Sequence, residues 1–163
     1  MLAQSKPPRR HRTPPPPTVF ALHALPDTRI ADLLARHVAD GASASAVADV
    51  VVTIWSKVDL ALTPIVAARG CALLYQRSLH RSSASFPWLA DAYGGAHSAP
   101  DLPALHRALA QQDPTTVAAA GTELLGGFRD QLAGLIGAAL TECLLRSAWT
   151  QPPYETPAQD TDQ

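Results

Sequence analysis

Four basic side chains within one short segment have the spacing of a single helical face. Arg77, His80 and Arg81 stand at positions i, i+3 and i+4. Arg69 lies two helical turns earlier, on roughly the same face. Arginine forms bidentate hydrogen bonds to carboxylate and phosphate oxygens, so this spacing predicts a surface that binds an anion or a partner protein. A structural role stays open, because cations near the end of a helix also stabilise its macrodipole.

The other polar side chains give no catalytic or metal-binding pattern. The sequence contains no GxSxG, HExxH or CxxC motif and no glycine-rich phosphate loop with a lysine. None of the six histidines lies three or four residues from another histidine or from a cysteine. Glu142 precedes Arg146 by four residues, the spacing of an ordinary ion pair on a helix surface. We therefore expect no catalytic residues, metal ion or cofactor, and an enzyme is the less favoured class.

Leu145 and Trp149 form a candidate interface. They end the last apolar segment, just before a polar C-terminal stretch, and the chain has only three tryptophans. An exposed apolar helix end would suit a partner protein or a second copy of the chain. Packing of both side chains in the core is the favoured interpretation, and the interface is the alternative.

The composition indicates that helices position these residues. The chain of 163 residues has 30 alanines and 21 leucines, which lose little conformational entropy in a helix, and 47% hydrophobic residues are enough for one core. Apolar residues recur at helical spacing between residues 20 and 150. We predict an all-α, single-domain bundle of four to five main helices.

Capping residues and prolines mark the predicted helix starts. Asp27, Ser43 or Ser45, and Asp113 are suitable N-caps, and Pro64 and Pro114 suit the first helical position. The predicted helices span residues 27–40, 43–62, 64–80, 103–112 and 114–149, with a short turn at 86–89. A long helix kinked at Pro64 is the alternative to a new helix there.

The segment 114–149 is predicted to be the central, most buried helix. Gly127, Gly134 and Thr141 fall seven residues apart, which predicts close packing of a neighbouring helix along this side. Alternatively, Gly126 and Gly127 divide the segment into two helices.

The N-terminal segment and the rest of the chain have opposite net charge. Residues 1–19 are rich in proline, and this composition predicts a disordered basic arm. The first 26 residues carry a charge of +4. The other 137 residues carry nine bases and fourteen acids, a charge of −5. Residues 151–163, with three prolines and three acids, predict a disordered acidic tail.

Localisation is predicted from the cysteines and the apolar segments. Two distant cysteines in apolar segments favour a reducing compartment, and we expect neither a secretory signal nor a transmembrane segment. Eleven arginines against two lysines, with many alanines, are typical of a bacterial genome of high GC content. We expect a bacterial protein of the cytoplasm.

These patterns favour a non-enzymatic regulatory or adaptor protein, expected to be a homodimer, that acts through helical contacts including the four basic residues. A sensor or enzyme with a pocket inside the bundle for a small anionic ligand is the first alternative. Nucleic-acid binding through the basic arm is a further alternative, although the acidic charge of the remaining chain argues against it.

Overall fold

The computed structural model describes residues 25–93 and 99–150, and the side chains of 28–93 and 99–146. The described residues form no strand, which confirms the predicted all-α class. The predicted arm, residues 1–19, and the predicted tail, residues 151–163, lie outside the described residues. The elements are α1 (Leu25–Ala39), α2 (Ala44–Ser82), the 3₁₀ helix η2 (Pro87–Ala92), α3 (Leu102–Ala110), α4 (Pro114–Ile136) and α5 (Ala138–Thr150).

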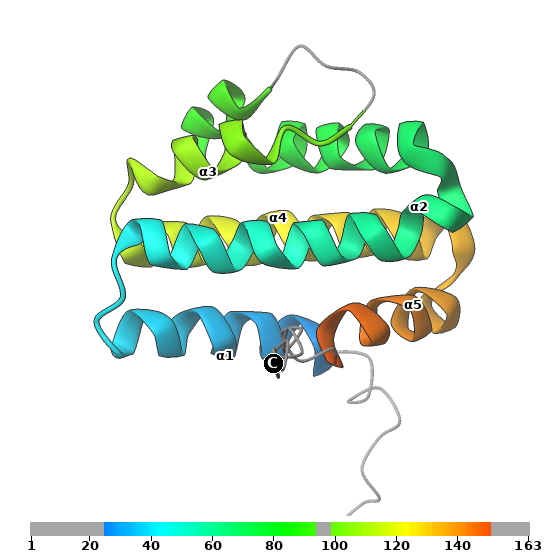
Figure 1. The fold of residues 1–163 in the computed structure, drawn as a ribbon, viewed down its shortest axis with the longest axis horizontal. Helices are drawn as coiled ribbons and strands as arrows, with labels where there is room; N and C mark the ends of the chain where they lie inside the picture. Colours follow the sequence, from blue (N-terminus) through cyan, green and yellow to red (C-terminus); the bar gives the residue numbers. More distant parts are fainter. Residues whose placement is uncertain (1–24, 94–98, 151–163) are drawn as a thin grey trace, which may run out of the picture.

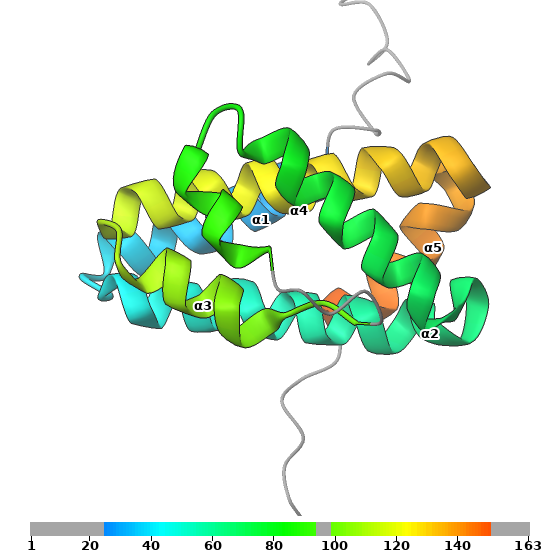
Figure 2. The ribbon, with the colours of Figure 1, turned by 90° about the horizontal axis from the view of Figure 1, so that it is seen from above.

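The helices form three layers (Figure 1). Helix α2 changes direction at Ala67, so its first half, residues 44–66, and its second half, residues 68–82, lie in different layers. The second half of α2 lies with η2 and α3 in the upper layer, the first half of α2 lies with α4 in the middle layer, and α1 and α5 form the lower layer. Seen from above, the second half of α2 crosses the helices below it obliquely (Figure 2).

The change of direction in α2 lies three residues beyond the predicted helix start at Pro64. Pro64 remains inside the helix, and Ala67 has a positive φ of 59° with ψ of 157°. The Thr63 hydroxyl donates to Cys71 Sγ over 4.0 Å and links the two halves of α2. The proline therefore marks the region of the turn but not the residue that makes it.

The last predicted helix is two helices, and the break lies at Gly137 rather than at Gly126 and Gly127. Gly137 has a φ of 88°, which glycine adopts without strain. The predicted close packing is wrong at Gly127 and Gly134, because a Cβ added to either would meet nothing within 4 Å. The close contact lies instead at Gly121, where an added Cβ would lie 2.6 Å from Val51 Cγ2.

Three aromatic side chains lie at the centre of the core and connect the upper and middle layers. Trp55 meets Tyr75 edge-to-face with ring centroids 5.0 Å apart, and it meets Phe128 in the same way at 4.7 Å. The three residues come from the first half of α2, the second half of α2, and α4. The Tyr75 hydroxyl donates to the Asp101 carbonyl over 3.5 Å, and burial raises the pKa of Tyr75. The core thereby fixes the second half of α2 against α4.

Helix starts follow the predicted caps in α2 and α4. Ser43 Oγ accepts a hydrogen bond from the Ala46 amide, and Asp113 accepts one from the Thr116 amide. Helix α1 begins at Leu25, so Asp27 lies inside its first turn and the prediction that Asp27 caps this helix is wrong.

Among the described residues, α2 is one helix that is long and apolar enough, by length and composition, to cross a membrane. Its most apolar window of 18 residues has a mean hydropathy of 1.6. This is weak evidence for a span, since the core helix of a soluble protein meets the same criterion. In this structure α2 changes direction at Ala67, and it packs against α4.

Candidate functional site

A surface groove of about 460 Å³ lies where the second half of α2, the end of η2 and α4 meet. Three of its side chains are basic, so we name it the cationic groove. Its lining residues are Leu73, Gln76, Arg77, His80, Arg81, Tyr93 and Gln131.

Helical spacing places the α2 residues of the groove on one face. Leu74, Ser78 and Leu79 are buried on the opposite face and pack toward the core. The intervening positions, including Leu73 and Arg77, therefore point outward. Burial of one face of α2 thus determines which residues the groove displays.

The three basic side chains of the groove are exposed and have no acidic neighbour in its lining. Within the described part of the chain, Arg77, His80 and Arg81 form no ion pair, and no carboxylate lines the groove. Two ion pairs lie elsewhere: Arg129 with Asp130 at 3.0 Å, and His106 with Asp49 at 2.9 Å without hydrogen-bond geometry. The positive charge of the arginines is therefore available to an anionic group from outside.

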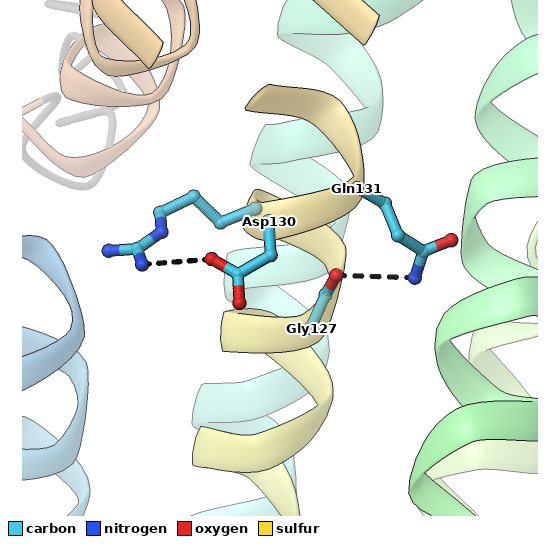
Figure 3. A network of polar contacts seen from close by, with 4 residues as sticks. Gly127, Asp130 and Gln131 are labelled. Atoms are coloured by element: carbon cyan, nitrogen blue, oxygen red, sulfur yellow. Dashed lines mark hydrogen bonds and ion pairs between the residues drawn. The ribbon is translucent and has the colours of Figure 1, made fainter. Parts of the chain in front are cut away.

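Gln131 is the residue of α4 that lines the groove. Its Nε2 donates to Ser78 Oγ over 3.0 Å and to the Gly127 carbonyl over 3.2 Å. Figure 3 shows its side chain leaving α4 toward the second half of α2, whereas Asp130 leaves α4 on another side. Gln131 Oε1 is buried and accepts no hydrogen bond from a described residue.

Tyr93, which directly follows η2, also lines the groove. Its hydroxyl donates to the Gln76 carbonyl over 3.4 Å, which holds the ring beside the second half of α2. Partial burial raises the pKa of Tyr93, so its hydroxyl is a neutral donor near neutral pH. The groove therefore combines cations with an aromatic ring.

The structure brings three of the four predicted basic residues together in the groove. Arg69 is exposed but does not line it, because it lies about one helical turn before Leu73, the first α2 residue of the lining. Leu145 is only 2% exposed and packs in the core. Core packing is therefore confirmed for Leu145, and an exposed apolar end at this residue is excluded. The side chain of Trp149 lies outside the described residues.

Sequence reasoning missed four lining residues. Leu73 stands four residues before Arg77, and helical periodicity could have placed it and Gln76 beside the cations. Tyr93 and Gln131 come from segments distant in the sequence, and no local pattern indicates that they meet α2.

The lining can bind an anion but lacks the groups of a common catalytic site. His80 has no carboxylate beside it in the lining to orient its ring, and the lining holds no thiol or aliphatic hydroxyl as nucleophile. No group of three or more histidine, cysteine or acidic side chains that could hold a metal ion occurs among the described residues.

The chain matches no protein-family model, no curated protein and no solved structure.

Proposed function

We propose that this protein is a non-enzymatic regulatory or adaptor protein, and that the cationic groove binds an acidic segment of a partner protein. The observation that carries the proposal is the meeting of Arg77, His80 and Arg81 at one open groove without an acidic residue in its lining. Arginine pairs with carboxylates in bidentate geometry, and partner aspartates or glutamates would supply the missing negative charge.

The apolar side chains of the groove favour a protein segment over a free ion. Leu73 is 54% exposed and Tyr93 is 39% exposed, both beside the cations. Tyrosine and arginine are enriched at protein interfaces, where apolar contact adds to charge pairing. A segment that alternates acidic and apolar residues would match this lining.

The proposed compartment is the cytoplasm. Cys71 and Cys143 are both free thiols, which suits a reducing compartment. The proposed adaptor role needs no cofactor.

A small anionic ligand is the second candidate occupant. The volume of about 460 Å³ lies within the usual range of ligand sites, which supports this alternative. The site is a surface groove whose lining includes no glycine, so the glycines of α4 do not make room for such a ligand.

Fluorescence anisotropy with a labelled peptide tests the proposal. The probe is a peptide of alternating Glu-Glu and Leu-Leu pairs, and a second probe has glutamine in place of every glutamate. We expect the double variant Arg77→Ala, Arg81→Ala to bind the acidic peptide about tenfold or more weakly than the unchanged protein, because two charge-assisted contacts are lost. Arg69→Ala is the matched control and should bind normally, because Arg69 does not line the groove.

The proposal is wrong if the unchanged protein and the double variant bind the acidic peptide equally, or if the glutamine peptide binds as well as the acidic one. Displacement of the peptide by inorganic phosphate at low concentration would instead favour the small-anion alternative.

A further inference from the structure

Ala67 has a backbone conformation that its side chain disfavours. It is the one non-glycine residue with positive φ among the described residues, at φ 59° and ψ 157°. This region is essentially restricted to glycine, so Ala67 is strained. Gly137 has nearly the same conformation, with φ 88° and ψ 149°, where α4 gives way to α5. The chain thus changes direction twice in the same way, once at a glycine and once at an alanine.

No loop separates the two halves of α2, and the three residues at the bend favour a straight helix. Ala67, Ala68 and Arg69 have high helix propensity. Pro64 already lies inside the helix in this structure, so it does not oppose a straight α2 more than the bent one. The bend is therefore held by packing between the two parts of the chain that it joins.

Straightening α2 would separate residues 25–66 from residues 68–150. The contacts that would break within one chain are core contacts: Trp55 against Phe128, and Val51 against Gly121. The contact between Asp49 and His106 would also break. A second copy in the same straight form would supply an identical partner for each of these groups.

We propose that this protein forms a domain-swapped homodimer, in which residues 25–66 of each copy pack on residues 68–150 of the other and Ala67 is the hinge. The swap keeps the core contacts and relieves the strain at both hinges.

This inference is independent of the cationic groove. All seven lining residues lie within residues 68–150, so each copy keeps a complete groove after the swap. Peptide binding and dimer formation can therefore fail separately.

The first test compares two single substitutions by sedimentation velocity, after concentrated protein has been incubated to equilibrium. Ala67→Gly removes the strain of the bent form and lowers the helix propensity of the straight form, so it should raise the dimer dissociation constant at least about tenfold. Ala68→Gly is the matched control: it lies one residue away, is exposed, and has helical backbone in both forms. It should leave the dissociation constant nearly unchanged.

The second test distinguishes a swap from contact between two unswapped copies. Asp49→Cys and His106→Cys are combined with Cys143→Ser, which removes an exposed thiol, and the dimer fraction is treated with a short bismaleimide. A swapped dimer gives a covalent dimer on a denaturing gel, because the introduced cysteines approach each other between chains. The monomer fraction should give cross-links within one chain only.

Three results would overturn the proposal. One is unchanged protein that stays monomeric after refolding at the highest soluble concentration. Another is a dimer fraction whose introduced cysteines are joined only within chains. The third is an equal effect of Ala67→Gly and Ala68→Gly on the dissociation constant.

Discussion

Gly121 is the residue at which α4 passes closest to α2. An added Cβ would lie 2.6 Å from Val51 Cγ2 and 3.2 Å from Leu34 Cδ1. We expect Gly121→Ala to lower the free energy of unfolding by about 1–3 kcal/mol, since buried side chains would have to shift. Gly134→Ala on the same helix is the matched control: its Cβ meets nothing within 4 Å, and it should raise the free energy of unfolding by up to about 1 kcal/mol. Urea unfolding measures both, and equal effects would contradict the packing described here.

Asp113 makes the start of α4 sensitive to pH. Hydrogen bonds from the Thr116 hydroxyl and the Thr116 amide lower the pKa of Asp113 below its ordinary value of 3.8. A carboxyl group whose pKa is lower in the folded state stabilises the fold above the unfolded-state pKa, and this stabilisation is lost as pH falls through the folded-state pKa. Asp113→Ala should therefore lower the Tm at pH 7, and the difference from the unchanged protein should shrink below pH 3.8.

Asp113→Asn is the control for this pH effect. Asparagine keeps an N-cap acceptor but has no carboxyl group to titrate. Thermal unfolding between pH 7 and pH 2 should show a smaller loss of Tm at pH 7 for Asp113→Asn than for Asp113→Ala. A difference between the alanine variant and the unchanged protein that is constant across this range would contradict the assignment.

At the scale of elements, the edge-to-face contacts of Trp55 hold the halves of α2 and α4 together. Phe128→Leu should lower the free energy of unfolding by about 1–2 kcal/mol, because it removes one of the two aromatic contacts of Trp55 and part of the buried volume. Phe86→Leu is the control, since Phe86 is half-buried at the edge of the core and its ring contact with Trp88 is tilted. Urea unfolding should show a smaller loss for Phe86→Leu, and a larger loss would place the central contact elsewhere.

A helix start is predictable from the sequence where neighbouring residues determine it. Asp113 and Pro114 fix the start of α4 through a capping side chain and a preset φ, and both effects depend only on neighbouring residues. The bend at Ala67 carries no such signal, because alanine is the strongest helix former and the bend depends on packing between distant parts of the chain. The predicted helix boundary at Pro64 is therefore three residues too early, because the proline is a local signal and the bend depends on tertiary packing.

The candidate site was predictable only along one helix. The spacing of Arg77, His80 and Arg81 determines that they share a face of α2. The groove leaves out Arg69 and includes Tyr93 and Gln131, because its extent depends on the contacts of η2 and α4 with α2. These are tertiary contacts, which local spacing does not encode.

At the scale of the whole molecule, the buried core of the described residues extends from Ile30 to Leu145. We expect removal of residues 1–18 to leave the free energy of unfolding within about 0.5 kcal/mol, the usual limit for changes outside a core. Urea unfolding of the shortened chain checks this. A larger loss would show that the arm packs on the bundle.

The same shortened chain tests the alternative of nucleic-acid binding. If the four positive charges of the arm bind DNA, affinity for a DNA duplex should fall steeply with salt and should be lost on removal of residues 1–18. Binding that persists without the arm would have to use another surface.

The most direct test of the central claim is chemical-shift mapping by NMR as the acidic Glu–Leu peptide is added to the protein. The proposal predicts shifts that saturate and that centre on Arg77, His80 and Arg81, extend to Tyr93 and Gln131, and spare Arg69. Shifts confined to other surfaces, or no saturable shifts at all, would contradict the assignment of the cationic groove as the binding site.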